Sequence, residues 1–255
     1  IENAIEKHLS IYNKLMTQKN ALLKLESLDK TKIKAIITDF DRTLTDLPPK
    51  IVFDKKEIDF ELLEKLGSLG FDLFLATGRP FRFIQSLCKK FPGFRCVIAE
   101  NGAVVYFPKT KRQLVTNSEH MKKVKTKIQK LGLPQTVIGL VSASVKAKYA
   151  KKVKNEIRGL TDQIKIVKNA DDILFLPARV DKGYGVRIAA QYLNIDLEKT
   201  IVVGDGENDV EMFINPGFKI ALANAHPRLK KLAHEITKNK SEKGILEIIQ
   251  KLSNK

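Results

Sequence analysis

Residues 33–43 read IKAIITDFDRT, an apolar run that ends at a pair of aspartates. The run is short, β-branched and apolar on successive positions, which is typical of a strand buried on both faces. Because side chains alternate along an extended chain, Asp39 and Asp41 point the same way if this geometry continues past Thr38. Ligands of open α/β sheets gather at the carboxyl ends of the strands. On their own, however, two acids after a strand are better explained as a solvated turn.

Strands and helices alternate in the sequence on either side of this run. Further apolar strands are predicted at residues 71–76, 96–99, 200–203 and 218–223, and amphipathic helices at about residues 57–69, from Pro80 to about 88, and at 188–193. Such alternation is typical of a parallel sheet with helices on both faces and right-handed crossovers. The predicted fold class is therefore α/β, with a Rossmann-like parallel-sheet core.

The pattern changes between residues 103 and 178. A hairpin is predicted at 104–115, followed by a helix with Met121 and Val124 on its apolar stripe and a strand near 136–141. A second helix with Val145 and Tyr149 on its stripe and two short strands, near 164–167 and 173–176, complete the pattern. These elements predict a small α+β module, residues 103–178, inserted into a core domain made of residues 31–102 and 179–255.

Residues 1–30 predict an N-terminal helical extension with Ile5, Leu9, Tyr12 and Met16 along one face. This stripe either packs against the core or forms the contact of a homodimer. No apolar run approaches the ~20 residues that span a bilayer, so we expect no membrane insertion. No stretch resembles a secretory leader, and two cysteines are too few for a disulfide framework. We therefore expect a cytoplasmic protein.

The chain is strongly basic, with 46 Lys and Arg against 29 Asp and Glu and a formal net charge of +17 over 255 residues. Residues 103–178 hold 16 of the basic residues and five of the acidic ones. Such an excess is typical of nucleic-acid binders. However, the sequence carries no nucleic-acid recognition motif and no tryptophan for base stacking. A lysine-rich solvated surface is the favoured explanation, and nucleic-acid binding is the alternative.

A second acidic turn follows the predicted strand at 200–203. It reads GDGEND at residues 204–209, so Asp205 also stands where an apolar strand stops, and Asp209 lies one helical turn further on. Carboxylates brought together in this way repel one another unless a cation intervenes. Mg²⁺ prefers oxygen ligands and keeps waters for an incoming phosphate. Three or four carboxylates, from Asp39, Asp41, Asp205 and Asp209, would suit that ion.

Two further segments offer places for a phosphate group. Thr77 and Gly78 follow the second strand and supply a hydroxyl and backbone N–H groups just before a helix begins. Lys182 precedes the strand at 200–203 by one helix and can supply a point charge against phosphate oxygens. Taken singly, each is equally well explained as a turn residue or a surface lysine. Four such loops in this order are hard to obtain by accident.

Together these segments resemble the haloacid dehalogenase (HAD) superfamily of phosphohydrolases. The matching motifs are Asp39-x-Asp41-x-Thr43, Thr77-Gly78-Arg79, Lys182 and Gly204-Asp205-x-x-Asn208-Asp209, within a resemblance that covers about residues 34–252. The insert, preceded by Glu100-Asn101-Gly102, is similar to a C2-type cap domain of the smaller C2B variety. Within that group it is similar to archaeal phosphoglycolate phosphatases.

The resemblance implies a role for each matching residue. Asp39 would be the nucleophile that forms an aspartyl phosphate, and Asp41 the general acid for the leaving oxygen and then the base for water. The implied phosphate-binding residues are Thr77, Gly78, Lys182 and Asn208. The implied Mg²⁺ site consists of Asp39, Asp205 and the backbone carbonyl of Asp41, with Asp209 in support. Arg42 departs from the glycine common at its position, and it either reaches a remote anion of the substrate or points to solvent.

The expected function is Mg²⁺-dependent hydrolysis of a small phosphorylated metabolite such as phosphoglycolate. One alternative is a sugar-phosphate phosphatase of the mannosyl-3-phosphoglycerate, sucrose-phosphate or trehalose-phosphate type. A second alternative is a phosphomutase similar to phosphomannomutase. A third is a basic nucleic-acid-binding module without catalysis, although such a module would have no need for four acids and Lys182.

Overall fold

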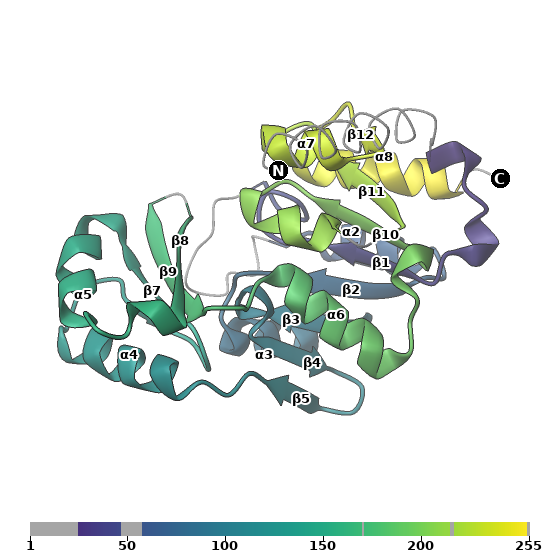
Figure 1. Cartoon of the computed structure of the whole chain (residues 1–255). Helices are drawn as coiled ribbons and strands as arrows, with labels where there is room; N and C mark the ends of the chain where they lie inside the picture. Colours follow the sequence, from purple (N-terminus) through teal and green to yellow (C-terminus); the bar gives the residue numbers. More distant parts are fainter. Residues whose placement is uncertain (1–24, 47–57, 170, 215–216, 254–255) are drawn as a thin grey trace, which may run out of the picture.

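The computed structural model describes residues 25–46, 58–169, 171–214 and 217–253. Within these residues the larger of two sheets has eight strands, in the order β12-β11-β10-β1-β2-β3-β4-β5 (Figure 1). The strands are β1 (Ala35–Thr38), β2 (Asp72–Ala76), β3 (Phe94–Ala99), β4 (Val104–Phe107), β5 (Arg112–Val115), β10 (Thr200–Gly204), β11 (Phe218–Ala221) and β12 (Glu235–Ile236). The pairs from β12 to β3 are parallel, which confirms the predicted α/β class.

Helices cover both faces of this sheet because its central strands are apolar on both sides. In β1, Ile36 packs on one face, while Ala35 and Ile37 pack on the other. The first face is covered by α2 (Phe60–Gly67), α3 (Phe81–Lys90) and α8 (Ser241–Ser253). The second is covered by α6 (Lys182–Leu193), the 3₁₀-helix η8 (Glu207–Phe213) and α7 (Pro227–Leu232). The edge strand β12 is a two-residue strand that the sequence pattern did not predict.

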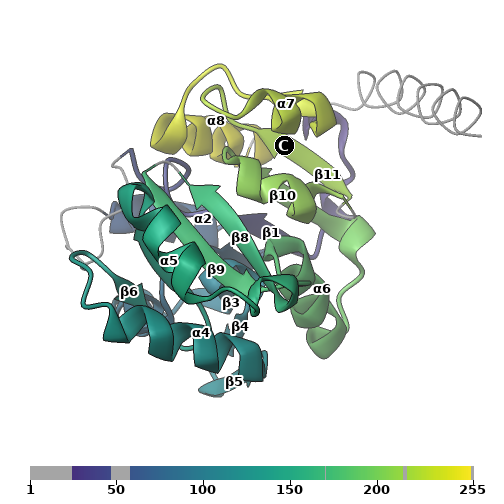
Figure 2. The ribbon, with the colours of Figure 1, turned by 60° about the vertical axis from the view of Figure 1, so that its left-hand side comes forward.

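A smaller antiparallel sheet of order β6-β7-β9-β8 forms a second body beside the carboxyl ends of the core strands (Figures 1 and 2). Its strands are β6 (Val137–Ile138), β7 (Ala143–Lys146), β8 (Ile164–Asn169) and β9 (Asp172–Pro177). Helices α4 (Glu119–Lys130) and α5 (Ala150–Glu156) cover one face through a core that includes Val124, Val153 and Phe175. Alternation along the strands turns Ser144 and Leu174 to the opposite face, toward the core domain.

Two details of the inserted module differ from the sequence interpretation. The hairpin β4-β5, expected within the insert of residues 103–178, pairs antiparallel with β3 and extends the core sheet. The connection between β3 and β4, residues 100–103, is too short for the crossover that a parallel pair needs. We therefore infer that the module begins after β5. Val145 lies in β7 and not on a helix, because its four-residue spacing from Tyr149 fits the two-residue period of a strand equally well.

Of the helical extension predicted at residues 1–30, residues 1–24 with the whole apolar stripe lie outside the described residues. Where the description begins, the chain forms two short 3₁₀ turns, η1 (Leu25–Ser27) and η2 (Lys30–Lys32). The N–H of Leu25 donates to the carboxylate of Glu235 at 2.9 Å, which fixes this segment to the β12 edge of the core. Among the described residues, no helix has the length and apolar character needed to cross a membrane.

Candidate active site

Asp39 and Asp205 meet because β1 and β10 are neighbouring parallel strands. Thr38 pairs in register with Val203, so the residues that follow both strands emerge at the same edge of the sheet. The hydroxyl of Thr43 lies between the two carboxylates, 3.4 Å from Oδ2 of Asp39 and 3.2 Å from Oδ1 of Asp205. The structure thus brings together the two acidic turns that lie far apart in the sequence.

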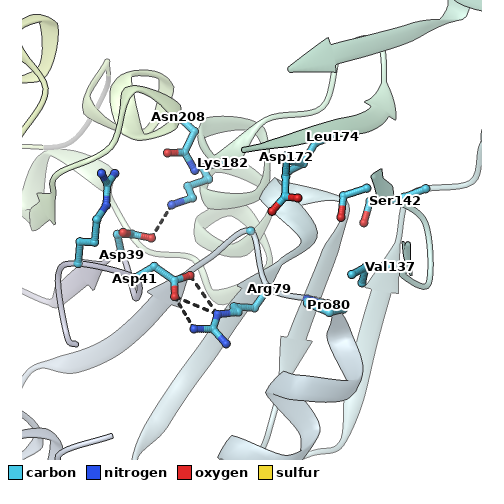
Figure 3. Close-up of a pocket in the computed structure, with 14 residues that line it drawn as sticks. Asp39, Asp41, Arg79, Pro80, Val137, Ser142, Asp172, Leu174, Lys182 and Asn208 are labelled. Atoms are coloured by element: carbon cyan, nitrogen blue, oxygen red, sulfur yellow. Dashed lines mark hydrogen bonds and ion pairs between the residues drawn. The ribbon is translucent and has the colours of Figure 1, made fainter. Parts of the chain in front are cut away.

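Lys182 joins this cluster from the first turn of α6. Its Nζ lies 2.5 Å from Oδ1 of Asp39 and 2.6 Å from Oδ1 of Asp209, and its side chain is 1% exposed (Figure 3). Burial acts to lower the pKa of Lys182, but the carboxylates of Asp209 and Asp39 outweigh it, so the pKa is raised. Lys182 is therefore a charged counter-ion of both aspartates.

Gly102 allows α6 to start close enough to the sheet for this contact. Its φ of +99° lies in the region that favours glycine, and a Cβ there would stand 1.9 Å from the carbonyl oxygen of Asp181. Asp181 is the N-cap of α6, and its carboxylate accepts the N–H of Tyr184 at 2.8 Å. The turn after β3 and the cap of α6 together place Lys182 as the first residue of the helix.

The carboxylates of Asp39, Asp205 and Asp209 each offer an oxygen within 4.8 Å of the others. Asp209 accepts the N–H groups of Asp205 and Gly206, at 3.0 and 2.8 Å, which locks the turn around it. The Asp41 carboxylate, counted among the candidate ligands from the sequence, is not part of this group.

The cluster carries more negative than positive charge. Burial, followed by the charge of the neighbouring carboxylates, raises the pKa of Asp205 to about 8 and that of Asp209 to about 6. Among the described residues, three buried carboxylates face one buried ammonium, that of Lys182, and the half-exposed guanidinium of Arg42. All-oxygen donors with unbalanced charge suit a hard divalent cation. The residues present therefore fit a metal ion.

Asp41 faces the cavity and is held there by Arg79. The Nε of Arg79 donates at 2.9 and 3.1 Å to the two oxygens of Asp41, and Nη2 donates at 2.6 Å (Figure 3). The guanidinium is buried and lies 5.4 Å from the ring of Phe40 and 4.5 Å from that of Phe83. This packing fixes Arg79, which in turn fixes the orientation of the Asp41 carboxylate.

A cavity of about 110 Å³ lies above these aspartates, between the core and the inserted module. Its core wall includes Gly78 and Asn208, together with Asp39, Asp41 and Lys182. Thr77, by contrast, is fully buried behind this wall, and its hydroxyl oxygen accepts the N–H of Arg79 at 3.1 Å. The structure therefore places Gly78, and not the side chain of Thr77, on the cavity surface.

The module contributes a wall of mixed polar and apolar residues with one charged side chain, that of Asp172. Ser142, Ser144 and Leu174 line the cavity together with Asp172, whose carboxylate pairs with Lys146 at 2.9 Å. Helices α4 and α5, which carry most of the lysines of the insert, cover the opposite face of the small sheet. The lysines of these two helices thus lie away from the cavity.

Glu100 connects the two bodies and was given no role from the sequence. Its fully buried carboxylate accepts five hydrogen bonds, from the N–H groups of Phe81, Leu140, Val141 and Ser142 and from the hydroxyl of Ser142. The distances run from 2.7 to 3.1 Å. A glutamate directly after a buried strand, as in β3, is the signal that could have identified it.

Asn224 is a second residue without a role in the sequence interpretation. It follows β11, and its Nδ2 lies 3.1 Å from Oδ2 of Asp205 and 3.0 Å from the carbonyl oxygen of Arg42. Asn101, which follows β3, contacts Asn208: its Oδ1 accepts a hydrogen bond from Nδ2 of Asn208 at 3.1 Å. Polar residues that follow four strands of the core sheet, β1, β3, β10 and β11, thus contribute to the site.

A family profile described as haloacid dehalogenase-like hydrolase matches residues 36–137 and 111–249 of the chain. This chain belongs to the haloacid dehalogenase-like hydrolases. A phosphoglycolate phosphatase of Archaeoglobus fulgidus is 31% identical over 224 residues, which cover 86% of this chain and 96% of the relative. The suspected superfamily and the prediction of an enzyme of its phosphatase type are confirmed.

Solved structures agree on the fold. A protein of Thermoplasma acidophilum is 19% identical with a TM-score of 0.67, covering 86% of this chain and 98% of that one. A sugar phosphatase of HAD subclass IIB is 20% identical with a TM-score of 0.59, covering 80% of this chain and 93% of the neighbour. Both matches support the fold described above.

Proposed function

We propose that this protein is an Mg²⁺-dependent phosphomonoesterase that acts through phosphorylation of Asp39, with phosphoglycolate as its substrate. The convergence of Asp39, Lys182, Asp205 and Asp209 in one buried cluster, of which Asp39 and Lys182 reach the cavity, carries the proposal. A carboxylate attacks a phosphate ester well only where the negative charge of both groups is neutralised. The cluster supplies both parts, a buried ammonium beside the nucleophile and oxygen ligands for a divalent cation.

In the first half of the reaction, an Asp39 oxygen forms a bond to phosphorus while the bond from phosphorus to the ester oxygen breaks. Asp41 donates a proton to the departing oxygen, so the product leaves as an alcohol. Lys182 balances the charge of Asp39 and of the transferred group. Gly78 and Asn208, on the cavity wall, hold the phosphoryl oxygens.

In the second half, Asp41 takes a proton from a water molecule that attacks phosphorus, and the bond to Asp39 breaks. Inorganic phosphate is released, and both carboxylates return to their starting states. Arg79 keeps Asp41 directed into the cavity for both proton transfers. The inserted module above the cavity limits the access of other waters.

Mg²⁺ would be held by Asp39 and Asp205, with Asp209 in support. When bound, it supplies Lewis-acid neutralisation of the phosphoryl oxygens. Asp209 keeps the turn that presents Asp205 in place through its two backbone hydrogen bonds. Thr43 orients both ligand carboxylates through its shared hydroxyl.

Phosphoglycolate is favoured because the match to the archaeal relative named for it covers 86% of this chain and 96% of that relative, and because the cavity is small. A sugar-phosphate phosphatase is the second candidate. Ser142 and Ser144 on the module wall offer hydroxyl groups that suit the hydroxyls of a sugar.

The test is a panel of phosphate esters assayed with Mg²⁺ and with a chelator. We expect phosphoglycolate to be the best substrate, with activity lost in the chelator and in Asp39→Asn while the circular dichroism spectrum is unchanged. Turnover retained in Asp39→Asn would contradict the assignment of Asp39 as the nucleophile. Preference for a sugar phosphate would establish the second candidate, and interconversion of isomers without phosphate release would indicate a mutase.

A further inference from the structure

Arg42 adopts a backbone conformation that L residues rarely take, with φ of +59°. Glycine would occupy this conformation without strain. The carbonyl oxygen of Arg42 accepts the Nδ2 of Asn224 at 3.0 Å, so the turn is held from outside the loop. Since the backbone would favour glycine, the reason for arginine lies in its side chain.

The guanidinium of Arg42 contacts a candidate metal ligand. Its Nη2 lies 3.2 Å from Oδ2 of Asp205, the same oxygen that faces Asn224. The Asp205 side chain is 1% exposed, whereas that of Arg42 is 53% exposed. The contact therefore joins a fixed buried carboxylate to a side chain that has room to leave it.

The other cations that line the cavity are not free to move in this way. Arg79 and Lys182 are both buried and are bound by Asp41 and by the aspartate cluster. Arg42 lines both the small cavity and an adjoining one of about 650 Å³. Lys165 and Lys168 of β8 line that second cavity together with Arg42, as do the acidic residues Asp181, Asp205, Glu207 and Glu211.

We propose that Arg42 is a specificity-determining residue that exchanges partners, binding Asp205 in the metal-free protein and a carboxylate of the substrate once the metal is bound. This inference rests on the proposed function and extends it to substrates that carry a second anion. It also answers the question left open by the sequence, because the side chain lies on the site and is not directed only to solvent.

The exchange follows from charge. A divalent cation bound by Asp205 would compete with the guanidinium for this carboxylate and would repel it. The released guanidinium stays in the cleft, where its planar fork matches a carboxylate in a bidentate contact. Because the two binding events are linked, metal strengthens the binding of the doubly anionic substrate, and the substrate strengthens the binding of metal equally.

The first experiment titrates Mg²⁺ into the substrate-free protein by calorimetry and compares wild type, Arg42→Gly and Arg42→Lys. Arg42→Gly suits the backbone and therefore folds. We expect it to bind Mg²⁺ about three- to tenfold more tightly, since an ion pair of this exposure contributes on that scale. Arg42→Lys keeps the charge and should fall between the two. Equal or weaker binding in Arg42→Gly would overturn the exchange.

The second experiment compares phosphoglycolate with 2-hydroxyethyl phosphate, which has the same length but no carboxylate. We expect the ratio of their kcat/KM values to fall about tenfold in Arg42→Gly, the loss of one charge-assisted contact. Arg158→Gly, which removes a cation from the far side of the module, should leave that ratio as in wild type. A ratio unchanged in Arg42→Gly, or reduced equally in Arg158→Gly, would contradict a direct contact.

These outcomes separate the two proposals. If the wild-type protein hydrolyses neither ester, the proposed function fails and the substrate half of this inference fails with it. The Mg²⁺ titration tests the contact of Arg42 with Asp205 without any measurement of activity.

Discussion

Lys182 and Asp39, 143 positions apart in the chain, form an ion pair of 2.5 Å in the buried floor of the cleft. The proposed nucleophile and the cation that neutralises it are therefore in contact before substrate arrives. Lys182 also binds Asp209, so one ammonium connects the ends of β1 and β10 to the start of α6.

Replacing Lys182 by methionine should destabilise the protein as well as abolish activity. The variant leaves Asp39 and Asp209 buried without their ammonium, which costs about 3–5 kcal/mol in comparable buried pairs. Urea unfolding measures the change. Lys199→Met, which breaks the exposed pair with Asp196, should change the free energy of unfolding by less than about 1 kcal/mol. Equal effects from the two variants would contradict the role of Lys182.

The metal-free protein should lose stability as pH rises. The pKa of Asp205 is raised to about 8 and that of Asp209 to about 6, from 3.8 in the unfolded chain. The folded state therefore holds protons that the unfolded state has released, and the free energy of unfolding falls between about pH 4 and pH 8.

Mg²⁺ should reverse this loss, because it replaces the missing protons. We expect it to raise the melting temperature by several degrees more at pH 8.5 than at pH 5.5. Asp205→Asn removes a proposed metal ligand and a carboxyl group whose pKa is raised. Both the pH dependence of stability and the effect of Mg²⁺ on the melting temperature should therefore shrink. The same Mg²⁺ increment at both pH values would contradict a metal site at these aspartates.

Glu100→Gln should loosen the contact between the module and the core. An amide has one acceptor oxygen, so turning it to Val141 and Ser142 leaves the N–H groups of Phe81 and Leu140 without a partner. Buried donors left unpaired cost about 1–3 kcal/mol each. Hydrogen exchange should accelerate at those two amides. Glu119→Gln, on the exposed start of α4, is the control. Unchanged hydrogen exchange in Glu100→Gln would contradict the role of Glu100 in holding the module against the core.

Gly102→Ala should displace Lys182. The added Cβ meets the carbonyl oxygen of Asp181 at 1.9 Å, and φ is +99°. Strained positions of this kind cost about 1–3 kcal/mol, and here the clash with backbone adds to the strain. Gly132→Ala is the matched control, because it also has a positive φ but no atom within 4 Å. Both variants should lower the free energy of unfolding, Gly102→Ala by more than Gly132→Ala. Only Gly102→Ala should also lose activity.

The main features of the fold were predictable because they depend on local patterns. Buried strands are continuous apolar runs, and the residues that end them, such as Asp39 and Asp205, must meet at one edge of a parallel sheet. The hairpin β4-β5 was assigned to the wrong body because a strand's sequence does not identify its pairing partner. The charge of the insert was visible, but only the packing of α4 and α5 shows that the lysines of these two helices lie away from the cavity.

The supporting contacts of the site were harder to predict. The donors to Glu100 are mostly backbone N–H groups about 40 residues away, and backbone groups leave no signature in residue type. The contact of Arg42 with Asp205 depends on a positive φ that nothing in the sequence demands. Such relationships arise from tertiary packing and appear only in the assembled structure.

The assignment of Asp39 as the nucleophile is tested most directly by trapping the phosphorylated enzyme. Acid quenching during turnover preserves an acyl phosphate, borohydride reduces it to homoserine, and peptide mass spectrometry locates the modified residue. We expect homoserine at position 39 in the wild-type protein and none in Asp39→Asn. Homoserine at another aspartate, or turnover in which no residue is ever reduced, would contradict it.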